Sequence, residues 1–244
     1  MSRRDNFVPR CADCRIEEKV CEAEEGRGPA YCPTIHMADV VAESRAEYEK
    51  PGIQKLAYNA SLQEGEGYAN KEKDNPHVRY PVKPRMQETI EFAHKMGYKK
   101  LGLAFCGGLR NEARIVNDIL KKQGFKVASV VCKAGKTPKE FLKITEEQKV
   151  NPETFESMCS PITQSMILNA ANTDFNILLG LCVGHDSLVM RYSKAFCTVL
   201  VVKDRVTGHN PLAAIQLHES YYKKLSEETF YKGGSVKVAI EENK

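Results

Sequence analysis

The chain has 244 residues, enough for one large domain or for a small domain joined to a medium one. Its 36 basic and 32 acidic residues are interleaved and leave a formal net charge of +4, which argues against nucleic-acid binding. No apolar run approaches the ~18–20 residues of a membrane span, and residues 1–6 lead into no apolar signal core. We therefore expect a cytoplasmic protein without membrane or nucleic-acid partners, whose nine cysteines stay reduced.

Four cysteines crowd the start of the chain with the spacing C-x2-C-x6-C-x10-C-P: Cys11, Cys14, Cys21 and Cys32. A C-x2-C pair can present two thiolates to one ion, and two more complete a tetrahedral zinc site or the ligands of an iron–sulfur cluster. The segment lacks a sustained hydrophobic period, so a bound metal would supply the folding energy that a core cannot. Residues 1–33 are predicted to form a four-cysteine metal module, with zinc and iron–sulfur both open. Thiols packed in a core are the alternative.

A helical segment and linker are predicted over residues 34–97. Helical periods run from about 35 to 49 and from 52 to 63. Their predicted inner stripe consists of Val40, Val41, Ala42, Tyr48, Leu56, Ala57 and Ala60. Residues 65–84, rich in proline and charge, are predicted to be a loop or linker. A further helix is expected from about Pro84 to Met96, ending at Gly97.

The region 98–218 has the alternating pattern of an α/β domain. Short apolar runs at 101–105, 126–131, 175–181 and 198–202 read as strands, and amphipathic segments separate them. Apolar strands that alternate with helices predict a small doubly wound parallel sheet, Rossmann-like or flavodoxin-like. Residues 219–244 are predicted to form a C-terminal helix and tail. The region has no dinucleotide-binding fingerprint, no Walker lysine and no nucleophile elbow.

Four further cysteines occupy equivalent places in this pattern. Cys106, Cys132 and Cys182 each follow a strand, and Cys159 lies just before the helix that opens at Pro161. The carboxyl ends of parallel strands and the amino ends of the following helices meet at one edge of a sheet, where such folds bind ligands. Helix amino termini also favour thiolates. We therefore predict a second thiolate site, for a 4Fe-4S cluster or zinc. Small hydrophobic side chains in the core are the alternative. Cys197 begins the fourth strand, at the opposite edge, and is predicted to be a core residue.

Polar residues and glycines are predicted at the same edge as a ligand-binding set: Gly107, Gly108, Gly184, His185, Asp186, Lys203, Asp204, Arg205, His209 and Asn210. Glycines let the backbone approach a ligand, and their N–H groups can bind sulfide or another anion. His185 has the alternatives of a ligand, an acid–base group or a structural histidine. Lys203, Asp204 and Arg205 have the alternative of an ion-paired turn.

Several motifs resemble those of a family of prokaryotic proteins labelled "metal-binding protein" that carry a domain of unknown function. They are Phe105-Cys106-Gly107-Gly108-Leu109 with Glu112-Ala113, Cys159-Ser160-Pro161-Ile162 with Gln164, Gly180-Leu181-Cys182-Val183-Gly184-His185-Asp186, Lys203-Asp204-Arg205 with His209-Asn210-Pro211, and Tyr31-Cys32-Pro33. The resemblance covers about residues 9–215 and implies a bound metal, but no particular reaction. The family usually has a proline at the position of Phe196 or Cys197, which again disfavours Cys197 as a ligand.

Three functions are compatible with this sequence. The first, which we favour, is an iron–sulfur protein with a redox or sulfur-handling role at the rim of the α/β sheet, working with a small-molecule or redox partner. The second is a zinc-stabilised, non-enzymatic protein that binds a small molecule or anion. The third is a metal carrier or thiol sensor. The sequence leaves enzymatic activity and oligomeric state open.

Overall fold

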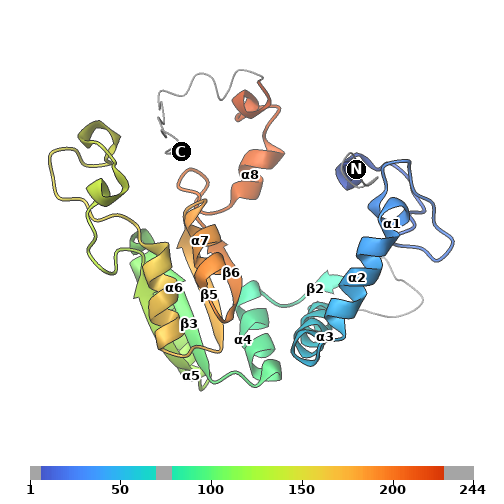
Figure 1. The fold of residues 1–244 in the computed structure, drawn as a ribbon, viewed down its shortest axis with the longest axis horizontal. Helices are drawn as coiled ribbons and strands as arrows, with labels where there is room; N and C mark the ends of the chain where they lie inside the picture. The colour runs from blue at the N-terminus through green and yellow to red at the C-terminus, as the bar shows by residue number, and fades with distance from the viewer. Residues whose placement is uncertain (1–6, 70–78, 228–244) are drawn as a thin grey trace. The chain divides into compact units, whose positions relative to one another are not determined.

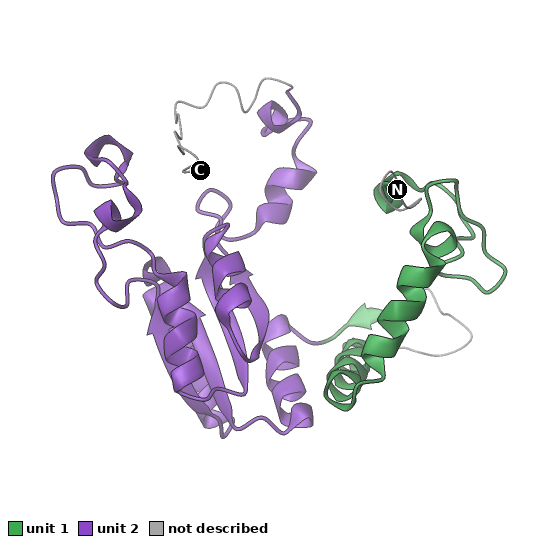
Figure 2. Cartoon of the chain, in the orientation of Figure 1, with its two compact units in different colours: residues 1–82 green, residues 83–244 purple. Residues whose placement is uncertain are grey.

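The computed structural model describes residues 7–69 and 79–227. Parts of the predicted linker (70–78) and tail (228–244) and the first six residues lie outside this range. The chain divides into two compact units, residues 1–82 and 83–244 (Figure 2).

The first unit consists of short helices and loops. After the 3-10 helix η1 (Cys11–Asp13) come α1 (Pro33–His36), α2 (Ala38–Tyr48) and α3 (Pro51–Glu66). The small strands β1 (Tyr68–Ala69) and β2 (Tyr80–Pro81) pair antiparallel, so part of the predicted linker is ordered. Prolines open α1 and α3, where the missing N–H costs no intrahelical hydrogen bond.

The predicted inner stripe of the helices is wrong for α2. Val40 and Tyr48 are exposed, and α2 buries no residue. Among residues 7–69, Cys32 is the only buried hydrophobic residue. The described part of this unit therefore has too little buried apolar surface to account for its order by hydrophobic packing alone.

The second unit is an α/β domain built on a four-stranded parallel sheet, which confirms the predicted fold class (Figure 1). Its strands are β3 (Lys100–Phe105), β4 (Lys126–Val131), β5 (Phe175–Leu181) and β6 (Phe196–Val202), in the order β4-β3-β5-β6. All seven residues of β5 are buried, as expected for a strand covered on both faces.

Two helices cover each face of the sheet. On one face, α4 (Arg85–Met96) and α5 (Arg110–Lys122) contribute Ala93, Val116 and Leu120 to a core with β3 and β5. On the other face, α6 (Pro161–Ala170) and α7 (His185–Tyr192) contribute Leu168 and Val189. The domain is therefore a three-layer α/β/α sandwich. None of the helices formed by residues 7–69 and 79–227 is long and apolar enough to cross a membrane.

Most of the predicted C-terminal helix and tail, residues 219–244, lies outside the described residues. Before it the chain forms α8 (Pro211–Gln216), and the described residues 219–227 include the 3-10 turn η5 (Lys223–Ser226). Pro211 occupies the first turn of α8, the position that proline favours.

A bulge at Gly180 interrupts the pairing of β5 with β6. The register shifts between Leu178 and Leu179 and again between Leu179 and Leu181. Gly180 lies within the second shift, and its φ angle of +66° is in the left-handed region. A Cβ atom here would lie 2.0 Å from Cδ1 of Leu109, a buried residue. Glycine is therefore required both by the backbone conformation and by the space.

Cys197 lies in β6 beside Asn176 of β5 and packs against the core under α6 and α7. Burial raises the pKa of its thiol. Both observations support the predicted core role.

A Cys197→Ala substitution should cost about 1 kcal/mol of unfolding free energy, because it truncates a small, partly buried side chain. Urea denaturation followed by circular dichroism measures this loss. Reactivity of the other cysteines should stay unchanged, and a change there would contradict a purely packing role.

Candidate functional site

The predicted rim cysteines lie where the strand pattern placed them. Cys106, Cys132 and Cys182 directly follow β3, β4 and β5, and Cys159 stands two residues before α6. The central strand β3 has β4 on one side and β5 on the other, so the chain crosses over β3 between β4 and β5. The carboxyl ends of β3 and β5 thus flank the topological switch point, the usual ligand site of this architecture.

Backbone hydrogen bonds tie these positions together. Cys106 N–H donates to Leu179 O at 3.0 Å, and Cys132 N–H donates to Phe105 O at 2.8 Å. Ser160 N–H donates to Cys132 O at 2.7 Å, which places Cys159 beside β4. The cysteines are therefore held by the sheet, not by a free loop.

Three of the four thiols meet at this edge. The Sγ atoms of Cys132 and Cys159 are 3.9 Å apart, and Cys132 lies close enough to Cys106 to lower the pKa of the Cys106 thiol. The backbone N–H of Gly107 donates to Cys132 Sγ at 3.3 Å. Cys132 is only 4% exposed, whereas Cys106 and Cys159 are partly exposed. We call Cys106, Cys132 and Cys159 the thiol triad.

The triad divides into two acidic thiols and one that keeps its proton. The hydrogen bond from Cys132, together with the N–H of Gly108 and the ammonium of Lys203, lowers the pKa of Cys106 to about 5. The same Cys132, with His185 and Lys133, lowers the pKa of Cys159 to about 4. Contact with these two thiolates and burial raise the pKa of Cys132. Contact with Cys159 raises the pKa of His185.

Cys182 does not join the triad. Arg205 Nη2 donates to its Sγ at 3.1 Å. The structure thus brings together three of the four predicted rim thiols, and the fourth is paired with a guanidinium.

The remaining residues of the predicted ligand set have different surroundings. A Cβ on Gly108 would lie 3.7 Å from Lys203 Nζ and 3.8 Å from Cys106 Sγ, so Lys203 faces the triad. Asp204 instead accepts hydrogen bonds from the N–H groups of Val206 and Thr207, which lower its pKa.

Four other predicted positions have local structural roles. The ring Nδ1 of His209 accepts a hydrogen bond from the backbone N–H of Asp204, and the backbone N–H of His209 donates to Asp204 O. Gly184 and Asn210 are the N-cap residues of α7 and α8, and Asp186 accepts a bond from Ser187 N–H. The structure therefore uses these residues to shape the loops of this edge.

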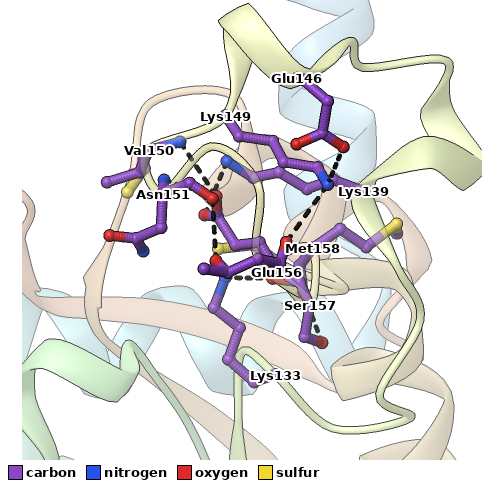
Figure 3. A network of polar contacts seen from close by, with 12 residues as sticks. Lys133, Lys139, Glu146, Lys149, Val150, Asn151, Glu156, Ser157 and Met158 are labelled. Atoms are coloured by element: carbon purple, nitrogen blue, oxygen red, sulfur yellow. Dashed lines mark hydrogen bonds and ion pairs between the residues drawn. The ribbon is translucent and has the colours of Figure 1, made fainter.

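The excursion between β4 and α6, residues 133–158, carries a polar network (Figure 3). Lys149, whose side chain is 2% exposed, contacts both Glu140 and Glu146. Glu156 forms a 2.7 Å ion pair with Lys139 and accepts two backbone N–H groups. These bonds fix an otherwise irregular segment.

The end of the excursion is anchored beside Cys159. Lys133 Nζ donates to Ser157 O at 2.5 Å, and Met158 N–H donates to Thr137 O at 2.8 Å (Figure 3). These two contacts fix the approach of the chain to Cys159 and bring the Lys133 ammonium close to its thiol.

Sequence reasoning missed the roles of Lys133 and Gln164. Gln164, fully buried in α6, donates from Nε2 to Phe105 O at 3.2 Å and to Val130 O at 2.7 Å. It therefore clamps the ends of β3 and β4 just before two triad cysteines. The sequence signal for Gln164 was an amide side chain on the apolar face of a predicted helix. Such a group requires hydrogen-bond partners when it is buried.

In the first unit the four cysteines are free thiols, with Cys32 buried and Cys11 and Cys21 exposed. Lys19 lies close enough to Cys14 and Cys21 for both to raise its pKa, after the larger effect of Glu22. Across the described residues, no three or more His, Cys, Asp or Glu side chains are arranged to hold a metal ion.

Alkylation by iodoacetamide should report the two acidic thiols. Cys106 and Cys159, with pKa values of about 5 and 4, are thiolates throughout pH 6–8, so their rates should be nearly constant. Cys197 should react faster as the pH rises, because burial raises its pKa. Peptide mass spectrometry after timed labelling measures each rate. A roughly tenfold rise per pH unit at Cys106 and Cys159 would mean ordinary thiol pKa values.

The fold and its rim define a small doubly wound α/β protein with a cysteine site at the switch point of its sheet. The family described as "Protein of unknown function (DUF1847)" matches residues 32–200, and the chain belongs to this family. It is 49% identical over 148 residues to an uncharacterized protein, MJ0455, of Methanocaldococcus jannaschii; the match covers 61% of this chain and 74% of that protein. No solved structure matches the chain.

Proposed function

We propose that the thiol triad is a site for redox or sulfur-handling chemistry. The observation that carries this proposal is the 3.9 Å contact of Cys132 Sγ with Cys159 Sγ, two thiols from separate segments, with Cys106 near enough to Cys132 for its pKa to shift. A disulfide requires an S–S distance of about 2.05 Å, so a modest side-chain rotation would join this pair. Thiolates are the nucleophilic form in such reactions, and Lys203 and His185 favour them here.

The test is a redox titration of the full chain in buffers of mixed reduced and oxidised dithiothreitol. Peptide mapping should find Cys132 and Cys159 converting reversibly to a disulfide. A Cys159→Ser variant should lose this transition, and a Cys197→Ser variant should keep it. The proposal is wrong if the triad stays reduced under conditions that oxidise exposed control thiols.

A metal centre on the same rim is the second candidate. Thiolates are the donors that zinc and iron–sulfur clusters prefer, so the donor set fits such a group in kind. The 3.9 Å sulfur separation is close to the edge, about 3.8 Å, of a tetrahedron with metal–sulfur bonds of ~2.3 Å. Cys106, Cys132 and Cys159 would be the ligands, with Cys182 as a fourth. Because the described side chains do not surround an ion as they stand, binding would require the thiols to reorient and Cys182 to leave Arg205. An iron–sulfur cluster would add one-electron transfer to the site, and zinc would add charge stabilisation or structure.

The first unit favours a structural metal on its own cysteines. Cys32 is the one buried hydrophobic residue among residues 7–69, and a metal would replace the missing core. We propose zinc or iron–sulfur ligation by Cys11, Cys14, Cys21 and Cys32.

Elemental analysis and a visible spectrum of anaerobically purified protein test both metal proposals. Iron with acid-labile sulfide, lost in Cys132→Ser but kept in Cys197→Ala, would support a cluster at the rim. Metal lost only in Cys14→Ser would locate it in the first unit. Protein free of metal after anaerobic purification would overturn both.

A further inference from the structure

We propose that Cys132 is a shared resolving thiol that serves two attacking cysteines, Cys106 and Cys159, in the reduction of a small disulfide. The proposal rests on the redox function proposed for the triad and adds a substrate class and an order of steps to it.

Burial separates the roles of the three thiols. Cys106 and Cys159 are partly exposed, so they are the two triad cysteines open to attack on a disulfide substrate. Cys132 is 4% exposed, its Sγ lies 3.9 Å from Cys159 Sγ, and it is close enough to Cys106 for each thiol to shift the pKa of the other. It is therefore shielded from a disulfide substrate but within reach of either cysteine once that cysteine has reacted. A resolving thiol requires this arrangement: it is sheltered from the substrate but within reach of the mixed disulfide.

Each attacking thiol also has its own cation. Lys203 Nζ and Cys106 Sγ both lie within 4 Å of the position of a Cβ on Gly108. Lys133 is anchored to Ser157 O, two residues before Cys159, and it and His185 both lower the pKa of Cys159. The strand ends that carry Cys106 and Cys132 are tied by the 2.8 Å bond from Cys132 N–H to Phe105 O, and Ser160 N–H bonds to Cys132 O. The backbone therefore holds both pairs in place at once.

The reaction balances without a further reagent. The Cys159 thiolate attacks one sulfur of R–S–S–R, forms Cys159–S–S–R and releases RS⁻. Cys132 then gives its proton to RS⁻, attacks Cys159 Sγ and expels the second RS⁻. One substrate disulfide has gained two electrons, and two protein thiols have lost them. Attack of the Cys106 thiolate on Cys132 Sγ then moves the disulfide to Cys106–Cys132 and frees Cys159, with no net electron transfer.

The experiment treats the full chain with substoichiometric glutathione disulfide, quenches it with acid and maps disulfides by mass spectrometry. The wild type should contain both Cys132–Cys159 and Cys106–Cys132, with little protein-bound glutathione. Cys106→Ser should form only the first bond and Cys159→Ser only the second. Cys132→Ser should accumulate glutathione on Cys106 and Cys159, and Cys132→Ala provides a second variant if the serine variant fails to fold.

The outcomes distinguish the shared resolving role of Cys132 from the redox function of the triad. A wild type that forms Cys132–Cys159 but never Cys106–Cys132 would overturn the shared role and leave the redox function standing. Direct Cys106–Cys159 bonding in the wild type would also overturn the shared role. Failure of every triad cysteine to react would remove the redox function itself. Cys197→Ala should behave as the wild type throughout.

Discussion

Replacing Cys32 by serine is expected to abolish the order of residues 7–36 while the α/β domain stays folded. This follows from the proposed metal ligation: Cys32 is the one buried hydrophobic residue in the described part of the first unit, so no apolar core would compensate for a lost ligand. Structural zinc contributes on the order of 10–16 kcal/mol of folding free energy in comparable small modules. Loss of one thiolate ligand should therefore be enough to unfold this segment. Amide hydrogen exchange in this segment should accelerate by more than about a hundredfold.

The comparison variant is Cys197→Ala, which leaves all N-terminal cysteines in place. Exchange in β3 and β5 serves as an internal reference, because these strands belong to the second unit. Unchanged protection of residues 7–36 in Cys32→Ser, or in protein dialysed against a chelator, would contradict metal-dependent order.

Replacing Gly180 by alanine should destabilise the α/β domain by about 2–4 kcal/mol, the sum of a left-handed backbone and an overpacked core. The φ angle at Gly180 is +66°, and a Cβ would lie 2.0 Å from Leu109 Cδ1 and 3.2 Å from its Cγ. Leu109 is buried among α5 and β5, so its side chain has little room to move. Urea denaturation monitored by circular dichroism gives the change in unfolding free energy.

Gly97→Ala is the matched control. Gly97 ends α4 with φ of +78°, but no atom lies within 4 Å of the position of a Cβ there. The unfolding free energy of Gly97→Ala should therefore fall by the backbone strain alone, about 1 kcal/mol. Equal losses for the two variants would show that Leu109 yields and that the close approach at Gly180 is not a constraint.

The position of the rim was predictable because it follows from backbone periodicity. Continuous apolar runs identified β3, β4 and β5, and the residue after each run is a cysteine. Parallel strands bring such positions to one edge whatever their side chains are. The same logic placed Cys197 at the opposite edge.

Side-chain partners were not predictable in this way. Cys182 has the same place after its strand as Cys106, yet it pairs with Arg205, which lies 23 positions further along the chain. The role of Lys133 depends on a network that includes the buried Lys149, in an excursion whose sequence is merely polar. The exposed Val40 and Tyr48 of α2 show that a helical period locates an apolar face without showing that anything covers it.

The spacing of the triad along the chain has a consequence for biosynthesis. Cys106, Cys132 and Cys159 come from three successive segments, and β5, which lies beside β3 in the finished sheet, is made after all of them. Two of the cations that favour the thiolates are made later still, because His185 follows β5 and Lys203 follows β6. A nascent chain emerging in order therefore lacks these cations when the three triad cysteines are already made. The full acidity of Cys106 and Cys159 needs the later strands, so their reactivity would report on folding on the ribosome.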